Sequence, residues 1–143
     1  MKPLNALLSL TTLFFATSLF SADLPKTPSV DGAKVYFIGL KDRKTVNKNF
    51  TIRFGLKGMG IAPAGVVAPG TGHHHLLIDM DELPDFSVPL GASEKLIHFG
   101  KGQTETQPKL SPGKHTLQLV FADYIHLPHD PPVVSEKITI TVK

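Results

Sequence analysis

The feature that most constrains the fold is a repeated two-residue alternation of apolar and polar side chains, broken by glycine and proline. The alternating runs are rich in β-branched and aromatic residues and cover 35–39, 50–56, 74–80, 95–99, 115–122 and 138–142. A period of two predicts strands, whereas a helix repeats its apolar residues every three or four positions. After the N-terminal leader no helical pattern appears. We therefore predict an all-β fold, a small antiparallel immunoglobulin-like β-sandwich.

The first 22 residues have the layout of a secretory signal peptide. Lys2 precedes a largely apolar run over residues 4–20, as in such leaders. We predict cleavage after Ala22, with cleavage after Ser18 as the alternative. An uncleaved membrane anchor is disfavoured because the run is short for a membrane span. We expect residues 23–33 to be a linker and residues 34–143 a single β-sandwich domain, in a periplasmic or secreted protein without stable membrane insertion after cleavage.

Charge and cysteine content exclude several classes of function. Once Lys2 is removed with the leader, 14 basic and 12 acidic residues leave a net charge of +2. This charge is too small, and the basic residues too scattered, to indicate nucleic-acid binding. The chain has no cysteine, so it has no disulfide, thiolate ligand or lipid-linked cysteine.

A run of three histidines is the strongest sign of chemistry. It occupies residues 73–75, and all seven histidines of the chain lie between residues 73 and 129. Side chains alternate between faces along a strand, so His73 and His75 share one face, about 6.5–7 Å apart. Two such imidazoles can converge on one ion. We predict that His73 and His75 are metal ligands and that His74, on the more apolar face, packs in the core.

Other histidines are predicted to complete the site, because a firm metal site needs three or four donors. His126 and His129 lie in a proline-rich segment that we interpret as a loop, where residues are seldom recruited for core packing. His98 ends a short strand and is a neighbouring or alternative ligand. Asp123 is predicted to orient a ligating ring through its second nitrogen. His115 lies on the buried face of its strand, and we assign it a structural role.

The donor set limits the choice of ion. Imidazole donors without thiolate suit Cu(II), Zn(II) or Ni(II), and the general order of affinities favours copper. We therefore expect a copper ion first and a zinc ion second. Met59 offers a thioether, but a lone loop methionine more often fills a gap in the core, so it is not part of the predicted site.

Several motifs together resemble a known family. They read MGIAPAG, GTGHHHLLID, IHFGKGQTET, LSPGKHTLQLVFAD and HLPHDPPVVSEKITITV, and they resemble the bacterial exported family called domain of unknown function 4399 over roughly residues 35–142. The resemblance implies a short signal-bearing protein with one β-rich domain. It also implies that the family pattern includes the histidines at His73, His74, His75, His98, His115, His126 and His129. The family has no established activity, so the resemblance supports a histidine site without naming its ligand.

The leading hypothesis is an exported binding module with a histidine-rich site for a divalent transition metal. One alternative is a structural or interaction module of the cell envelope, whose histidines form a hydrogen-bonded network without metal. Another is a metalloenzyme with an open coordination position. No nucleophile motif, paired acid and base or phosphate-binding loop is recognisable, so binding is favoured over catalysis. The sequence predicts no particular protein partner.

Overall fold

The computed structural model describes residues 24–143, which form ten strands and no helix. The strands are β1 Lys34–Ile38, β2 Lys44–Val46, β3 Ile52–Lys57, β4 Gly60–Ile61, β5 Thr71–Ile78, β6 Leu96–His98, β7 Glu105–Thr106, β8 Gly113–Ala122, β9 Pro128–Val134 and β10 Ile138–Val142. This confirms the all-β prediction. No part of residues 24–143 is a helix with the length and hydropathy to cross a membrane. The predicted signal peptide lies outside the described residues.

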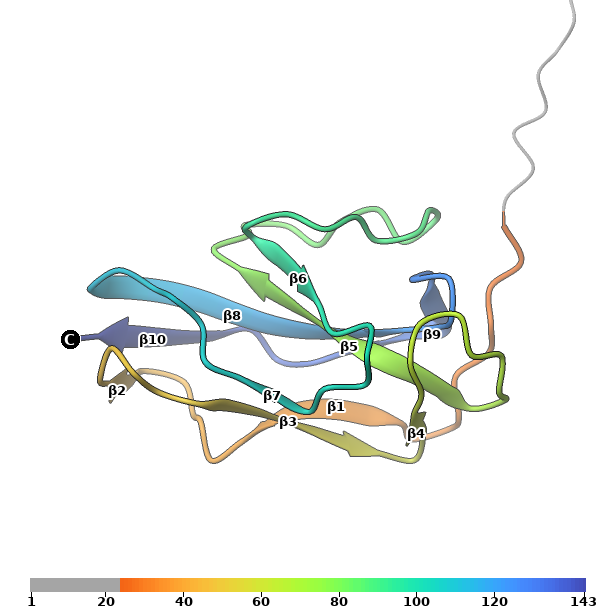
Figure 1. Cartoon of the computed structure of the whole chain (residues 1–143), viewed down its shortest axis with the longest axis horizontal. Coiled ribbons are helices and arrows are strands. Elements are labelled where there is room, and N and C mark those ends of the chain that lie inside the picture. Colours follow the sequence, from red (N-terminus) through yellow and green to blue (C-terminus); the bar gives the residue numbers. More distant parts are fainter. Residues whose placement is uncertain (1–23) are drawn as a thin grey trace, which may run out of the picture.

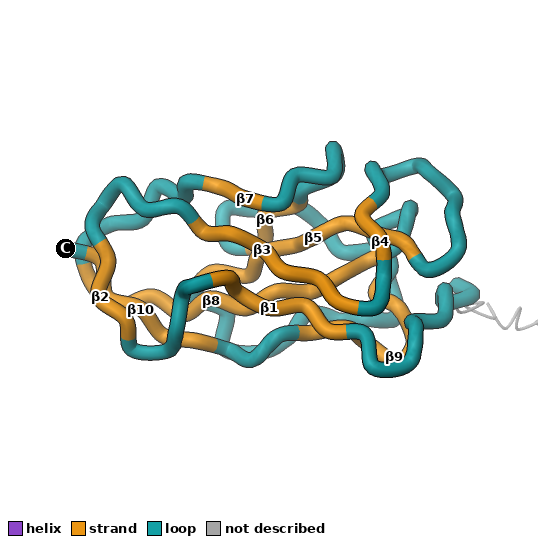
Figure 2. Tube along the Cα trace, turned by 90° about the horizontal axis from the view of Figure 1, so that it is seen from below, coloured by secondary structure: helices purple, strands orange, loops and turns teal. Residues whose placement is uncertain are grey.

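The strands form two sheets that face each other (Figures 1 and 2). The small sheet has the order β1-β3-β7 and is antiparallel. The large sheet has the order β2-β10-β8-β5-β4, with β6 also paired to β5 and β9 also paired to β8. Most pairs are antiparallel as expected, but β2 runs parallel to β10 and β4 runs parallel to β5. The large sheet is therefore mixed.

Alternation along the strands fills two separate apolar clusters. The main core lies between the sheets and joins Val35, Ile52 and Phe54 of the small sheet to residues of the large sheet that include Leu76, Leu119, Phe121 and Ile140. The opposite face of the large sheet carries a smaller cluster of Leu77, Leu90, Leu96, Val120 and Ala122, against which Phe86 packs. Because Phe86 and Leu90 lie in the segment connecting β5 to β6, that segment covers this outer face. Strand β5 is consequently buried on both faces from Gly72 to Ile78.

One stretch that we interpret as a loop from sequence is a strand. Residues 128–134 form β9, which pairs only with β8 among the strands. Prolines lack the amide hydrogen that a central strand needs, but an edge strand tolerates them. Pro131 and Pro132 are exposed, whereas His129 is fully buried. The expectation that residues of this segment avoid core packing is therefore wrong for His129.

Candidate metal site

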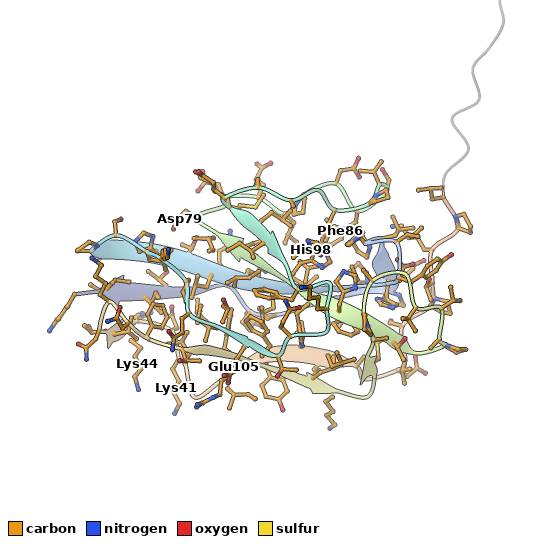
Figure 3. The ribbon with its side chains drawn as sticks, viewed as in Figure 1. Lys41, Lys44, Asp79, Phe86, His98 and Glu105 are labelled. Atoms are coloured by element: carbon orange, nitrogen blue, oxygen red, sulfur yellow. The ribbon has the colours of Figure 1, made fainter. Side chains whose placement is uncertain are left out.

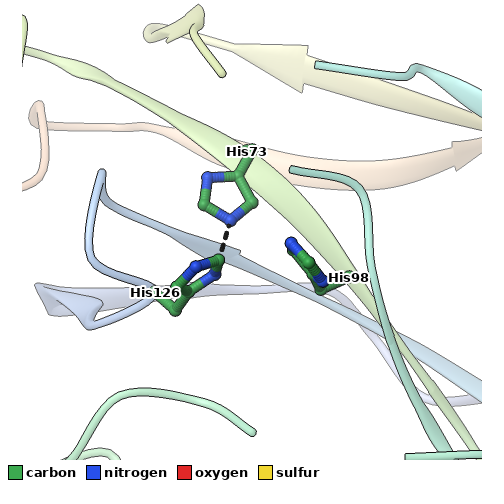
Figure 4. Close-up of side chains that lie close together, drawn as sticks. All are labelled: His73, His98 and His126. Atoms are coloured by element: carbon green, nitrogen blue, oxygen red, sulfur yellow. Dashed lines mark hydrogen bonds between the residues drawn. The ribbon is translucent and has the colours of Figure 1, made fainter. Parts of the chain in front are cut away.

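Three histidines from distant parts of the chain meet on the outer face of the large sheet. Each of His73, His98 and His126 offers one possible ligand atom, and these atoms lie within 4.8 Å of one another (Figure 4). Nε2 of His73 and Nδ1 of His126 are 3.0 Å apart and share a hydrogen bond. Only a folded chain can bring together residues separated by 53 positions. The structure thus joins three of the five histidines that the sequence predicts as ligands.

Pairing of β6 with β5 explains why the side chains of His73 and His98 lie on the same face of the sheet. His98 is the register partner of His75, and antiparallel partners place their side chains on the same face. His73 lies two residues before His75 and shares that face. Figure 3 shows His98 and Phe86 on the side of the large sheet away from β1 and β3. The histidines therefore adjoin the smaller apolar cluster.

A tight turn after β8 presents His126. The carboxylate of Asp123 accepts hydrogen bonds from the backbone amides of Ile125 and Leu127, both at 3.0 Å. His126 itself has a φ of 67°, a left-handed conformation that costs a non-glycine residue roughly 1–2 kcal/mol. Strain of this kind persists where the surroundings impose it, often at functional sites.

The role of Asp123 differs from the sequence expectation. Among the described residues, its side chain bonds to the turn amides and to the hydroxyl of Thr27, which donates to it at 2.6 Å, and to no imidazole. Asp123 therefore positions His126 through the backbone of the turn. Thr27 was not recognisable from sequence, because it lies in the expected linker and follows no alternating pattern.

His75 stands next to the three histidines without sharing in their hydrogen bond. Its ring centroid lies 4.8 Å from that of His73, 5.7 Å from that of His126 and 5.8 Å from that of His98. The residue is 0 % exposed, and neither ring nitrogen has a hydrogen-bond partner. Nδ1 of His73 is also buried without a partner. Buried polar atoms are seldom left unpaired in native proteins, so these three nitrogens call for an explanation.

Burial keeps these imidazoles neutral at pH 7. Loss of solvent, reinforced by the neighbouring His126 and His98, lowers the pKa of His73 to about 4. Burial, together with the neighbouring imidazoles, lowers the pKa of His75 to about 3. The pKa of His126 is also lowered, mainly by burial and then by His98. A neutral imidazole has a free lone pair, which is the form that binds metal.

The four clustered histidines differ in their exposure to solvent. His73 and His75 are fully buried and His126 is half-buried, whereas His98 is exposed. The solvent-facing part of the cluster is therefore His126 and, above all, His98. Gly100 makes room for this side chain, because a Cβ at that position would collide with Nε2 of His98.

The remaining histidines lie elsewhere. His74 points into the main core, with its ring centroid 5.1 Å from that of Phe54 and 5.3 Å from that of Phe121. This confirms that it packs in the core. Burial lowers its pKa to about 4, and neither of its ring nitrogens has a partner. His74 is therefore packed in the core without a hydrogen bond to either ring nitrogen.

His115 and His129 each have local partners. Nδ1 of His115 lies 2.7 Å from a carboxylate oxygen of Asp79, and Nε2 lies 2.9 Å from the carbonyl of Ser111. Burial by itself would lower the pKa of His115, but these two hydrogen bonds and the negative charge of Asp79 together raise it. The structural role predicted for His115 fits these contacts. His129 is not brought to the cluster: its ring stacks on Phe121 and lies 3.2 Å from the carbonyl of Thr71.

Comparison with known proteins identifies a family but no function. A family model described as "Domain of unknown function (DUF4399)" matches residues 52–143. The match includes every histidine discussed above and begins later than the resemblance seen in the motifs. No curated protein and no solved structure matches the chain. The chain therefore belongs to the DUF4399 family.

Proposed function

We propose that this protein is an exported binding module that holds a divalent transition metal, copper first and zinc second, at His73, His98 and His126. Export to the periplasm or beyond rests on the leader expected from the sequence. We also infer that the two facing sheets are an immunoglobulin-like sandwich forming one domain over residues 34–143. The observation that carries the proposal is the convergence of three ligand atoms within 4.8 Å.

A hydrogen-bonded network without metal accounts less well for the same cluster. Such a network should pair the buried ring nitrogens with one another or with the backbone. Only one contact of this kind is present among the clustered rings, between His73 and His126. Nδ1 of His73 and both nitrogens of His75 remain unpaired. A neutral imidazole has one N–H and one lone pair, so at least one nitrogen of His75 offers a lone pair that no hydrogen bond uses.

The chemistry of the donors supports copper or zinc over harder ions. Calcium and magnesium prefer oxygen ligands, whereas neutral imidazole suits copper, zinc and nickel. Asp123, which lies three residues before His126, already bonds to Thr27 and to two backbone amides. The set of donors is therefore mainly imidazole.

Calorimetric titration of the metal-stripped, tag-free chain with Cu(II) and with Zn(II) tests the proposal. We expect one ion per chain, and at least a tenfold loss of affinity in the double variant His98→Ala/His126→Ala, because two of three donors are removed. His115→Gln is the matched control, since it removes a histidine outside the cluster. Absence of binding in the wild type, or equal binding by the double variant, would refute the metal site.

A further inference from the structure

The four clustered imidazoles are already arranged like the ligands of a single tetrahedral ion. Their six centroid separations are 4.8, 5.8, 4.8, 5.8, 5.7 and 4.7 Å, so each ring is close to the other three. In a tetrahedral complex with metal–nitrogen bonds of about 2.0–2.1 Å, ring centres lie about 3.2 Å from the ion and therefore about 5.2 Å from one another. The observed separations scatter around this value.

The orientation of one ring departs from this arrangement. His75 is not among the three residues whose ligand atoms already lie within 4.8 Å of one another. Its ring is instead stacked on that of His98, with an angle of 28° between the planes. The torsion about the bond from Cβ to an imidazole ring has broad minima. His75 can therefore turn a nitrogen inward without moving the backbone of β5.

No side chain among the described residues holds His75 in its present orientation through a hydrogen bond, and the backbone of His73 is a polar group near its ring. Both of its nitrogens are buried and unpartnered among the described residues. The residues nearest to it in the sheet, other than histidines, are apolar, such as Leu77 on the same face and its register partner Val120. His74 is also buried with both nitrogens unpaired, but it lies among phenylalanines, whereas His75 lies beside three potential ligands and is placed for coordination.

We propose that His75 turns inward when the ion binds and completes a four-imidazole tetrahedral centre with His73, His98 and His126. This inference rests on the proposed function and deepens it. Four protein ligands fill the position that catalytic sites keep open for water or substrate, so the ion would be cargo or a structural element and not a catalyst. A tetrahedral centre also suits zinc, whereas Cu(II) prefers tetragonal geometry. This geometry should reduce the difference in affinity by which nitrogen donors otherwise favour Cu(II) over Zn(II).

Cobalt(II) is the probe that reports this geometry. Four-coordinate Co(II) has intense visible absorption bands and six-coordinate Co(II) has weak ones, so we would record spectra during titration of the full chain. The wild type should develop intense bands. His75→Phe should still bind Co(II) through the other three histidines, but with at least a tenfold lower affinity and shifted bands, because a solvent ligand then replaces the fourth imidazole.

His74→Phe is the matched control, because it makes the same substitution one residue earlier, on the opposite face of β5, and should leave the spectrum unchanged. Weak bands in the wild type, or identical spectra for wild type and His75→Phe, would overturn the four-imidazole centre while leaving the three-histidine site intact. No Co(II) binding by the wild type would remove the proposed function as well.

A second measurement needs no variant and covers the case in which His75→Phe fails to fold. X-ray absorption of the zinc-loaded wild type counts coordinated imidazoles through their multiple-scattering signal. Four imidazoles would support the inference, and three imidazoles with a further light atom would contradict it.

Discussion

At the scale of residues, three consecutive histidines have three different environments. His73 shares a hydrogen bond with His126, His75 is buried with two free nitrogens, and His74 faces the main core on the other side of the strand. The core position of His74 carries a cost in unpaired polar atoms. An unpaired polar atom in an apolar core costs about 1–3 kcal/mol, and His74 has two such nitrogens. No hydrogen bond within the described residues offsets this cost.

His74→Phe should therefore stabilise the metal-free protein. The new ring keeps the aromatic contacts with Phe54 and Phe121 and removes two buried nitrogens. We expect the free energy of unfolding at pH 7 to rise by about 1–3 kcal/mol, measured by chemical denaturation. His115→Phe provides the contrast, because it removes a ring that bonds to Asp79, and it should destabilise. Unchanged or reduced stability of His74→Phe would mean that His74 has a partner in solution.

At the scale of elements, the site depends on short segments that hold ligands against a rigid strand. Strand β6 has only three residues, Leu96–His98, yet it sets His98 beside His75 through the register with β5. Immediately after it, Gly100 leaves the space that the ring of His98 occupies. The backbone of Gly100 does not require a positive φ, so the absence of a side chain serves the packing of His98.

Gly100→Ala should weaken metal binding without unfolding the protein. The added Cβ would displace the flexible ring of His98, and its next neighbour, Cβ of Ala64, lies at a tolerable 3.4 Å. We expect titration to show a loss of affinity of about tenfold or more, typical of a misplaced ligand, with a change in unfolding free energy below about 1 kcal/mol. Gly91→Ala is the control, since a Cβ there meets nothing within 4 Å. Equal affinity in both variants would show that His98 is not a ligand.

The sequence predicts some of the strands and part of the candidate site, but not how distant strands pair. Alternation located β1, β3, β8 and β10 and placed His73 and His75 on one face, because these features follow from local geometry. It could not place β9, since its prolines are tolerated only at a sheet edge, and the edge is a tertiary property. Whether residues 128–134 form a loop or a strand decides the position of His129, which the strand places away from the site. Likewise, the pairing of β6 with β5 and the contact of Thr27 with Asp123 connect distant residues and leave no local signal.

At the scale of the whole molecule, buried histidines make stability depend on pH. The pKa values of His73, His74 and His75 fall to about 4, 4 and 3, first of all because burial disfavours their charged forms. The unfolded chain takes up protons near the ordinary value of 6.5, whereas the native state does not until the pH is much lower. The unfolded state therefore binds more protons between these values, and acid favours unfolding. The pKa of His126 is lowered too, so the raised pKa of His115, which acts in the opposite direction, is one group against four.

We expect the metal-free protein to lose stability steadily as the pH falls from about 6.5 towards 4. His74 alone should contribute a slope of up to about 1.4 kcal/mol per pH unit in this window. Denaturation curves at several pH values would measure the slope for the wild type and for His74→Phe, which should be less steep. A pH-independent stability over this window, or equal slopes for the two proteins, would contradict this account of the buried imidazoles.

The position of the site on the outer face of the large sheet has a consequence for how this fold can diversify. The main core packs against one face of β5, while His73 and His75 occupy the other face, with His98 and His126 beside them. Changes to this ligand set leave the packing between the sheets untouched. Natural or engineered substitutions could therefore replace the metal ligands one at a time. Such substitutions would change which ion is preferred while the fold stays the same.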